Sequence, residues 1–292
     1  MTARQTALFL INPRSGTRTG KQAPALQRQI ADAARQHGWE AEPVITQYKG
    51  HSIELVRQAV RDGIARVVAV GGDGTINEIA QELRHTNTAL GILPFGSGNG
   101  LARHLGISLK PELALNQFFT GQAKPMDYGL ANEIPFFCTS GVGFDAYVGN
   151  LFDKATRRGF SSYVSITFEA YWAYRPVQYC INGEPKTLYT ATFANAAQYG
   201  NNAWIAPQAN VADGQLDVNL TGPFPLTAAP RIFSQLFTKS LDKSKYVELF
   251  RARQITLEAD EPLLIHYDGE PRQLNTNRLT VSIVPGGIRV VY

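Results

Sequence analysis

Residues 1–125 alternate between short apolar segments and helical patterns, and this alternation constrains the fold more than any other feature of the chain. TALFLI (6–11), PVIT (43–46), RVVAV (66–70) and ALGIL (89–93) have the composition of buried strands. Helical patterns, with apolar residues at i, i+3 and i+4, occupy 22–37, the stretch around 53–60, 76–83 and 111–121. Alternating β and α units of this length predict a parallel sheet with helices on both faces.

The second half of the chain has a different pattern, which begins near residues 124–128. Strand-like segments dominate it, and one helix is expected around 160–174. Asn182-Gly183 predicts a β-hairpin, and Pro285-Gly286-Gly287 predicts a turn between the last two strands. We therefore expect an α/β domain at 1–126 and an antiparallel β-sandwich domain at 127–292. Whether the last strand packs back on the first domain stays open.

The composition is that of a folded globular protein. The chain has 292 residues, of which 44% are hydrophobic and 18% charged, and this excludes disorder. No apolar run approaches the roughly 20 residues of a membrane span, and the N-terminus lacks the apolar core of a signal peptide. We expect a cytoplasmic protein, with Cys138 and Cys180 as buried free thiols.

The charge of the chain is mildly basic, with a formal net charge of +4 and a pI near 9.0. No dense Lys/Arg run of the kind that binds nucleic acid is present. The best basic clusters are KATRR (154–158) and KSLDKSK (239–245). They are either solvated surface or a contact for anionic lipid head groups.

The turn Gly71-Gly72-Asp73-Gly74-Thr75 follows the third predicted strand and opens a helix. Glycines at such a turn free backbone N–H groups to face a phosphate, and the helix N-terminus adds partial positive charge. A carboxylate beside a phosphate is repulsive. Asp73 therefore caps a tight turn, contacts a divalent cation or accepts a hydroxyl proton, and the turn alone does not decide between these roles.

Two further loops extend this pattern. LPFGSGNGLARHLGI (93–107) leaves the fourth strand through glycines, and NPRSGTRTG (12–20) follows the first. Because the carboxyl ends of parallel strands lie at one edge of a sheet, we expect all three loops to converge there. None is a Walker A loop, and the GVGFDA segment at 141–146 resembles a dinucleotide fingerprint only superficially, since it lies in the β-rich half.

GGDGTINE followed by PFGSGNGLARHLGI resembles the diacylglycerol kinase catalytic-domain family, which includes bacterial lipid kinases and sphingosine kinases. The resemblance covers nearly the whole chain. It also takes in Asn12-Pro13 with Ser15-Gly16, Thr46 with Lys49-Gly50-His51, Met126 to Gly129, Gly141 to Asp145, Asn195 with Tyr199-Gly200, Ala206 to Asp217, and Asp268-Gly269-Glu270.

The resemblance implies ATP-dependent phosphorylation of a lipid hydroxyl in a cleft between an α/β domain and a β-sandwich, with Mg²⁺ between the phosphates and the protein. Asp73 would be the partner of that metal, and Asp268 or Glu270 the base. A structural Mg²⁺ would use Asp213 with the carbonyls of Asn210 and Gln215. The residues implied for ATP are Asn12, Pro13, Arg14, Ser15, Gly16, Thr46, Gly71, Gly72, Asp73, Gly74, Thr75, Ile76, Asn77, Ser97, Gly98 and Asn99.

One departure leaves the acceptor open. Ser97-Gly98-Asn99-Gly100 lacks the Asp that follows Asn in many diacylglycerol kinases and is similar to the sphingosine kinase form. Two rival functions also stay open: a kinase of a soluble acceptor, because NAD kinases carry a similar Gly-Gly-Asp-Gly turn, and a catalytically silent lipid- or nucleotide-binding module. A homodimer is a further possibility. Five aromatic residues are either core or a surface facing the inner membrane: Phe152, Phe160, Tyr171, Trp172 and Tyr174.

Overall fold

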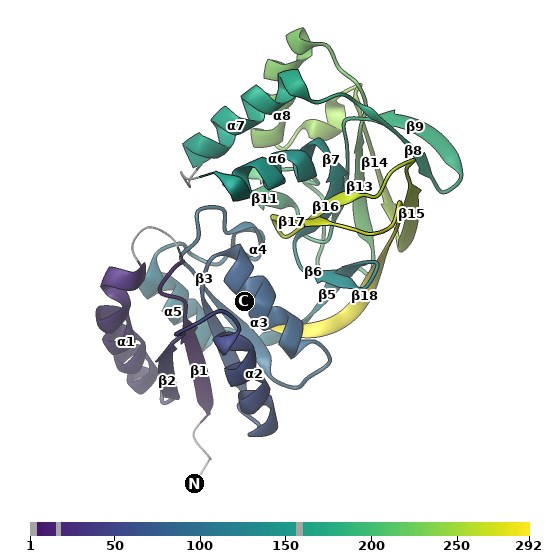
Figure 1. Cartoon of the computed structure of the whole chain (residues 1–292). Coiled ribbons are helices and arrows are strands. Elements are labelled where there is room, and N and C mark those ends of the chain that lie inside the picture. The colour runs from purple at the N-terminus through teal and green to yellow at the C-terminus, as the bar shows by residue number, and fades with distance from the viewer. Residues whose placement is uncertain (1–4, 16–18, 156–159) are drawn as a thin grey trace. The chain divides into compact units, whose positions relative to one another are not determined.

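The computed structural model describes residues 5–15, 19–155 and 160–292. Its contacts divide the chain into two units (Figure 1). Unit 1 comprises residues 1–126 together with 286–292, and unit 2 comprises residues 127–285.

Unit 1 is built on a parallel sheet in the strand order β2-β1-β3-β4. The strands are β1 (Thr6–Ile11), β2 (Glu40–Ile45), β3 (Arg66–Gly71) and β4 (Ala89–Pro94). β2 starts before the predicted residue 43, since Glu40 already pairs with Thr6. The residues of β3 beyond Arg66 are buried, as expected for a strand covered on both faces.

The helices of unit 1 follow the predicted alternation. They are α1 (Thr19–Gln36), α2 (His51–Arg61), α3 (Asp73–Leu83), the short α4 (Gly100–His104) and α5 (Pro111–Thr120). α1 packs with α5, and α2 packs with α3 (Figure 1). Ile76, Ile79, Ala80 and Leu83 form the buried stripe of α3. The predicted parallel sheet with flanking helices is confirmed.

Unit 2 is an antiparallel β-sandwich, as predicted. One sheet has the order β14-β13-β10-β7-β16-β17, and the other runs from β18 through β15 and β8 to β9. Their bounds are β7 (Thr139–Gly143), β8 (Val177–Ile181), β9 (Glu184–Leu188), β10 (Thr190–Ala194), β13 (Leu216–Thr221), β14 (Val247–Ala252), β15 (Gln254–Glu258), β16 (Leu264–Tyr267), β17 (Glu270–Gln273) and β18 (Arg278–Val291). The remaining strands are β5 (Ala123–Ala131) and the short β6 (Ile134–Phe136), β11 (Gln198–Gly200) and β12 (Ala203–Trp204).

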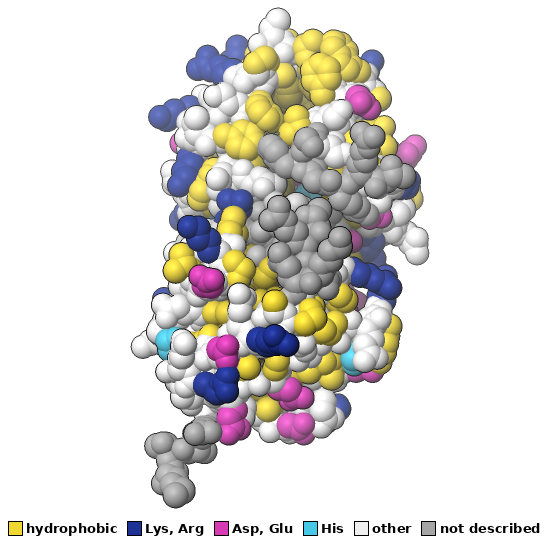
Figure 2. All heavy atoms as spheres, turned by 90° about the vertical axis from the view of Figure 1, so that its left-hand side faces the viewer, with side chains coloured by type: hydrophobic (Ala, Val, Ile, Leu, Met, Phe, Trp, Pro, Cys, Tyr) yellow, Lys and Arg dark blue, Asp and Glu magenta, His cyan; other side chains and the backbone are white. Residues whose placement is uncertain are grey.

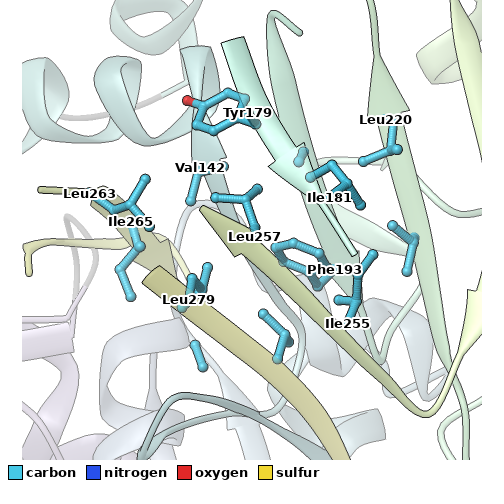
Figure 3. Close-up of a cluster of buried hydrophobic side chains, with 14 of the residues drawn as sticks. Val142, Tyr179, Ile181, Phe193, Leu220, Ile255, Leu257, Leu263, Ile265 and Leu279 are labelled. Carbon is cyan, nitrogen blue, oxygen red and sulfur yellow. The ribbon is translucent and has the colours of Figure 1, made fainter. Parts of the chain in front are cut away.

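The core of the sandwich lies between these two sheets (Figure 3). Val142 and Phe193 of the first sheet pack with Ile181, Leu257 and Leu279 of the second. Asn182-Gly183 forms the predicted hairpin between β8 and β9, with φ of 50° and 91°. Both cysteines are free thiols; Cys138 is buried as predicted, but Cys180 is only half-buried.

Unit 2 carries more helix than predicted. The expected helix is present as α7 (Phe160–Ala173), and α6 (Phe144–Lys154) packs with it. Unit 2 also contains α8 (Ala229–Phe237) and the short 3-10 turns η1 (Leu226–Ala228) and η2 (Leu241–Lys243). Gly149 in the middle of α6 weakens the helical signal of that segment.

The predicted turn at Pro285-Gly286-Gly287 is wrong. β18 continues through these residues, and its partner changes: Arg278 to Ser282 pair with β15, whereas Val290 pairs with Leu90 of β4. Pro285 has no N–H to give to a ladder, and Gly286 has a φ of 60°, so the regular pairing is interrupted without a reversal of the chain. The last strand therefore contributes to both units.

Candidate functional site

The three glycine-bearing loops of unit 1 begin at one edge of the parallel sheet. Ile11 at the end of β1 pairs with Val70, and Gly71 at the end of β3 pairs with Pro94 of β4. The loops after β1, β3 and β4 therefore start side by side, as the sequence predicts.

Side chains of the loop after β1 form hydrogen bonds with α3, the helix that follows β3. Asn12 donates from Nδ2 to Thr75 Oγ1 at 2.9 Å, and the hydroxyls of Ser15 and Thr75 lie 3.1 Å apart. Thr46, after β2, joins the same edge because its amide donates to the Ile11 carbonyl at 2.9 Å. Thr75 is buried, and its hydroxyl holds Asn12 and Ser15 of the loop after β1 in place.

Asp73 connects the turn after β3 to the loop after β4. Its Oδ2 accepts the Asn99 amide and its Oδ1 the Gly100 amide, both at 2.8 Å. Asn99 in turn accepts from the Gly96 amide at 2.9 Å and donates to the Gly96 carbonyl at 2.7 Å. The carboxylate thus fixes the shape of the neighbouring loop, a role that the sequence reading did not identify.

The two loops touch through their glycines. A Cβ built on Gly96 would lie 2.6 Å from Gly72 Cα, and one built on Gly72 would lie 3.0 Å from Gly96 Cα. Only backbone fits between them. Glycine is therefore required at both positions for close packing of the loops.

The other predicted nucleotide residues fall into three groups. Ile76 and Asn77 are buried in α3, so a ligand would meet only their backbone. Ser97 and Arg14 are exposed, Pro13 and Gly98 are half-buried in the loops, and Gly74 is half-buried in the first turn of α3. Gly16 lies outside the described residues.

In unit 2, Asp268-Gly269 forms the turn of the β16–β17 hairpin. Both residues have positive φ, 47° and 87°, and Tyr267 pairs with Glu270 across the turn. The Asp268 carboxylate accepts three backbone amides: Phe137 at 2.8 Å, Cys138 at 2.7 Å and Thr139 at 3.1 Å. Glu270 opens β17 and is exposed. The two candidate bases therefore have different surroundings.

A buried polar network lies behind this hairpin. Asp145, in the first turn of α6, places Oδ2 3.0 Å from each of His266 Nε2, Thr192 Oγ1 and Tyr199 Oη. The side chains of Asp145 and His266 are only 11% and 5% exposed. A Cβ on Gly141 would lie 2.7 Å from Asp145 Oδ2 and 2.9 Å from His266 Nε2, so glycine makes room for the pair.

Sequence reasoning gave no role to this network, although GVGFDA and Tyr199 were among the residues that carry the family resemblance. Burial alone would raise the pKa of Asp145, but the charge and hydrogen bond of His266 and the hydroxyls of Thr190 and Thr192 outweigh it, so its pKa lies below the usual value. Burial and the Asp145 charge raise the pKa of Tyr199, which stays a neutral donor.

The lowered pKa of Asp145 predicts a pH-dependent contribution to stability. The ionised carboxylate stabilises the fold above its unfolded-state pKa of about 4, and this contribution is lost as pH falls through the lower folded-state pKa. Asp145→Asn should therefore cost on the order of 2 kcal/mol at pH 7. The difference in Tm from the wild type should shrink below about pH 4.

Thermal unfolding between acidic and neutral pH measures this effect. Asp242→Asn, an exposed change in the same unit, is the matched control and should follow the wild type throughout. A Tm difference for Asp145→Asn that does not vary with pH would contradict the assignment.

The predicted structural metal residues lie in the loop before β13. Asp213 accepts the Gln215 amide at 3.0 Å, and Asp127 accepts the Gly214 amide at 2.7 Å. Arg251 Nη1 lies 3.7 Å from Asp213, and Arg251 Nε lies 3.3 Å from Asp217. Two carboxylates, those of Asp213 and Asp217, thus lie near the Arg251 guanidinium.

Carboxylate and carbonyl oxygens are the ligands that a hard cation such as Mg²⁺ takes. Burial raises the pKa of Asp217, the Asp213 charge adds to that effect, and Arg251 opposes it. Within the described part of the chain, the buried Asp217 Oδ2 has no hydrogen-bond partner. Among the described residues no three His, Cys, Asp or Glu side chains converge as a metal site, so an ion here would also need carbonyl oxygens, such as those of Asn210 and Gln215.

We expect added Mg²⁺ to raise the Tm of the wild type in a chelator-treated preparation, because an ion bound only to the folded state stabilises it. Asp213→Asn should abolish the rise, whereas Asp260→Asn, an exposed change in the same unit, should preserve it. A Tm that is insensitive to Mg²⁺ in the wild type would remove the structural metal.

No described helix is long and apolar enough to cross a membrane.

The diacylglycerol kinase catalytic domain model matches residues 6–131, and the model of the YegS C-terminal NAD kinase beta sandwich-like domain matches residues 139–292. A "probable lipid kinase YegS-like" protein of Pseudomonas aeruginosa is 31% identical over 93% of this chain and 91% of its own length. One of Chromohalobacter salexigens is 29% identical over 84% of this chain and 82% of its own length.

Solved structures agree on the fold. A diacylglycerol kinase from Bacillus anthracis str. Sterne superimposes with a TM-score of 0.76 at 18% identity, covering 100% of this chain and 98% of that one. The strand–loop–helix unit around Asp73 lies in the part of the chain that matches the catalytic-domain model, and the β-sandwich lies in the part that matches the C-terminal model. The chain is a kinase and belongs to the diacylglycerol kinase catalytic-domain family, in the form that carries the YegS-type C-terminal β-sandwich.

Proposed function

We propose that this protein is an ATP-dependent lipid kinase, which transfers the γ-phosphate of ATP to the hydroxyl of a membrane lipid such as diacylglycerol or a sphingoid base. The observation that carries the proposal is the hydrogen-bonded junction of three loops at one sheet edge, made through Thr75 and Asp73. Relatives named as probable lipid kinases support the acceptor class.

We assign phosphate binding to unit 1. The backbone amides of the 71–75 turn and the N-terminus of α3 would bind phosphate oxygens, and glycine permits their close approach. Asn12, Ser15 and Thr46 would border the nucleotide. Mg²⁺ bound with ATP would neutralise phosphate charge during transfer. Asp73 would face that ion while its carboxylate keeps the 96–100 loop in place.

We assign proton acceptance to the β16–β17 hairpin of unit 2. The lipid hydroxyl must lose its proton as the new O–P bond forms, and a carboxylate within reach would accept it. Three amides already bind the Asp268 oxygens, so this carboxylate is suited to holding the hairpin. We propose Glu270, which is two residues further on and exposed, as the acceptor.

A labelling experiment separates this function from its rivals. Purified protein is incubated with γ-labelled ATP and Mg²⁺, against a mixed lipid extract and, separately, a panel of soluble metabolites. Label confined to the organic phase supports the lipid kinase. Label in water-soluble product supports a soluble acceptor, and ATP binding without turnover supports a silent module; either outcome would overturn the proposal.

We further propose that the enzyme works in the cytoplasm and visits the inner membrane surface, where its substrate lies. The formation of a homodimer is a separate proposal. Light scattering after size exclusion would measure the mass in solution against the 32.1 kDa of one chain.

A further inference from the structure

Exposed large apolar side chains concentrate in one part of unit 2. Of the nine that the described residues contain, six lie in or beside α7 and α8, namely Tyr163, Phe168, Trp172, Val177, Leu226 and Phe233. Figure 2 shows hydrophobic side chains gathered at this end of the unit, with Lys and Arg side chains beside them. Soluble proteins rarely expose contiguous apolar patches of this kind unless the patch binds something.

The most exposed of these side chains share a helix face. Phe168 and Trp172 of α7 are 64% and 56% exposed and are one helical turn apart, so they project from the same side. The sequence of α7, FSSYVSITFEAYWA, has a single charged residue, Glu169. Apart from Glu169, no charged side chain of α7 opposes contact of this face with an apolar environment.

Aromatic stacking connects α7 to the segment that leads into α8. Tyr171 stacks on Phe224 with ring centres 5.7 Å apart, and its hydroxyl donates to the Phe224 carbonyl at 3.2 Å. Leu226 follows at once and is 40% exposed. On α8, Phe233 packs on Phe237 and is 48% exposed. Tyr171 and Phe224 therefore connect α7 to the segment that carries Leu226 and continues into α8.

The charge around this surface is positive. Residues 160–175 and 222–246 contain five basic residues against two acidic ones. Arg175 donates to the backbone carbonyls of Trp172 and Tyr174, which holds its guanidinium at the end of α7. The basic residues are Arg175, Arg231, Lys239, Lys243 and Lys245, and all are exposed.

We propose that this surface, the α7–α8 face (Phe168, Trp172, Leu226 and Phe233 with Arg175 and Arg231), binds the interface of an anionic lipid bilayer. Aromatic and aliphatic side chains enter the boundary between head groups and acyl chains, and the basic side chains bind the anionic head groups. The positive border favours a lipid surface over a second copy of this chain, which would bring the same positive charge to the contact. The sequence reading included Trp172 and the 239–245 cluster in a membrane-facing surface; the structure adds Phe168, Leu226 and Phe233, and it shows Tyr171 and Tyr174 to be half-buried.

Flotation with vesicles tests the proposal. The wild type should float with vesicles of equal parts phosphatidylcholine and phosphatidylglycerol, and much less with phosphatidylcholine alone. The double variant Phe168→Ser with Trp172→Ser should bind at least about tenfold more weakly, since two large apolar side chains no longer enter the bilayer. Leu109→Ser with Leu113→Ser, a matched pair of exposed apolar residues in unit 1, should bind as the wild type.

The measurement needs no turnover, so it stands or falls independently of the lipid kinase assignment. Arg175→Gln with Arg231→Gln should weaken binding to the anionic vesicles and reduce its dependence on salt. Circular dichroism should show all variants folded. Equal flotation of the Phe168/Trp172 variant and the wild type would overturn the proposal. A wild-type dimer that this variant dissociates, without vesicle binding, would instead assign the face to a second copy of the chain.

Discussion

Glu270→Gln is expected to lower kcat by about 10²–10⁴-fold, which is the usual contribution of a general base, while KM for ATP stays nearly unchanged. Gln keeps the size of the Glu270 side chain but cannot accept the proton of the lipid hydroxyl. Initial rates with labelled ATP and calorimetric ATP binding measure the two effects. Glu261→Gln, which removes another exposed carboxylate from unit 2, is the matched control and should retain full activity.

Asp268→Asn should act by a different route. Its carboxylate binds three backbone amides, and an amide side chain has only one oxygen to offer them. We expect a loss of about 1–3 kcal/mol in stability, because donors at the hairpin lose their acceptor. If Asp268→Asn kept the wild-type Tm and lost turnover while Glu270→Gln stayed active, Asp268 would be the base.

Asp73→Asn is expected to lower activity at least about 10²-fold and to abolish Mg²⁺-dependent nucleotide binding. Both carboxylate oxygens of Asp73 accept amides of the 96–100 loop. Asn can accept only one of these, and its NH₂ group would face the other donor, so the loop must shift.

Nucleotide affinity with and without Mg²⁺ separates the two roles of Asp73. Asp62→Asn, an exposed change in unit 1, should leave both affinities at their wild-type values. If Asp73→Asn lost activity while the Mg²⁺ dependence of binding persisted, the carboxylate would position the loops and would not be a metal partner.

The three glycine-bearing loops were predictable from the sequence because each comes directly after a buried strand in the chain. Strand β3 is a continuous apolar run, and the stripe of Ile76, Ile79, Ala80 and Leu83 repeats with the 3.6-residue period of a helix, so both are local patterns. Parallel pairing then brings the loops to one edge. The same reasoning failed at Pro285-Gly286-Gly287, where local turn residues lie inside one long strand.

The sequence by itself determined the alternation of strands and helices, the sandwich and the glycine loops, because these depend on neighbours along the chain. Only the tertiary structure decided where Asp145, His266, Tyr199 and Thr192 meet, how Asp268 is held by the amides of residues 137–139, and that β18 joins β4. These contacts link residues far apart in sequence. The free energy of a buried carboxylate depends on which donors surround it. Because those donors come from distant segments, the local sequence around the carboxylate does not predict them.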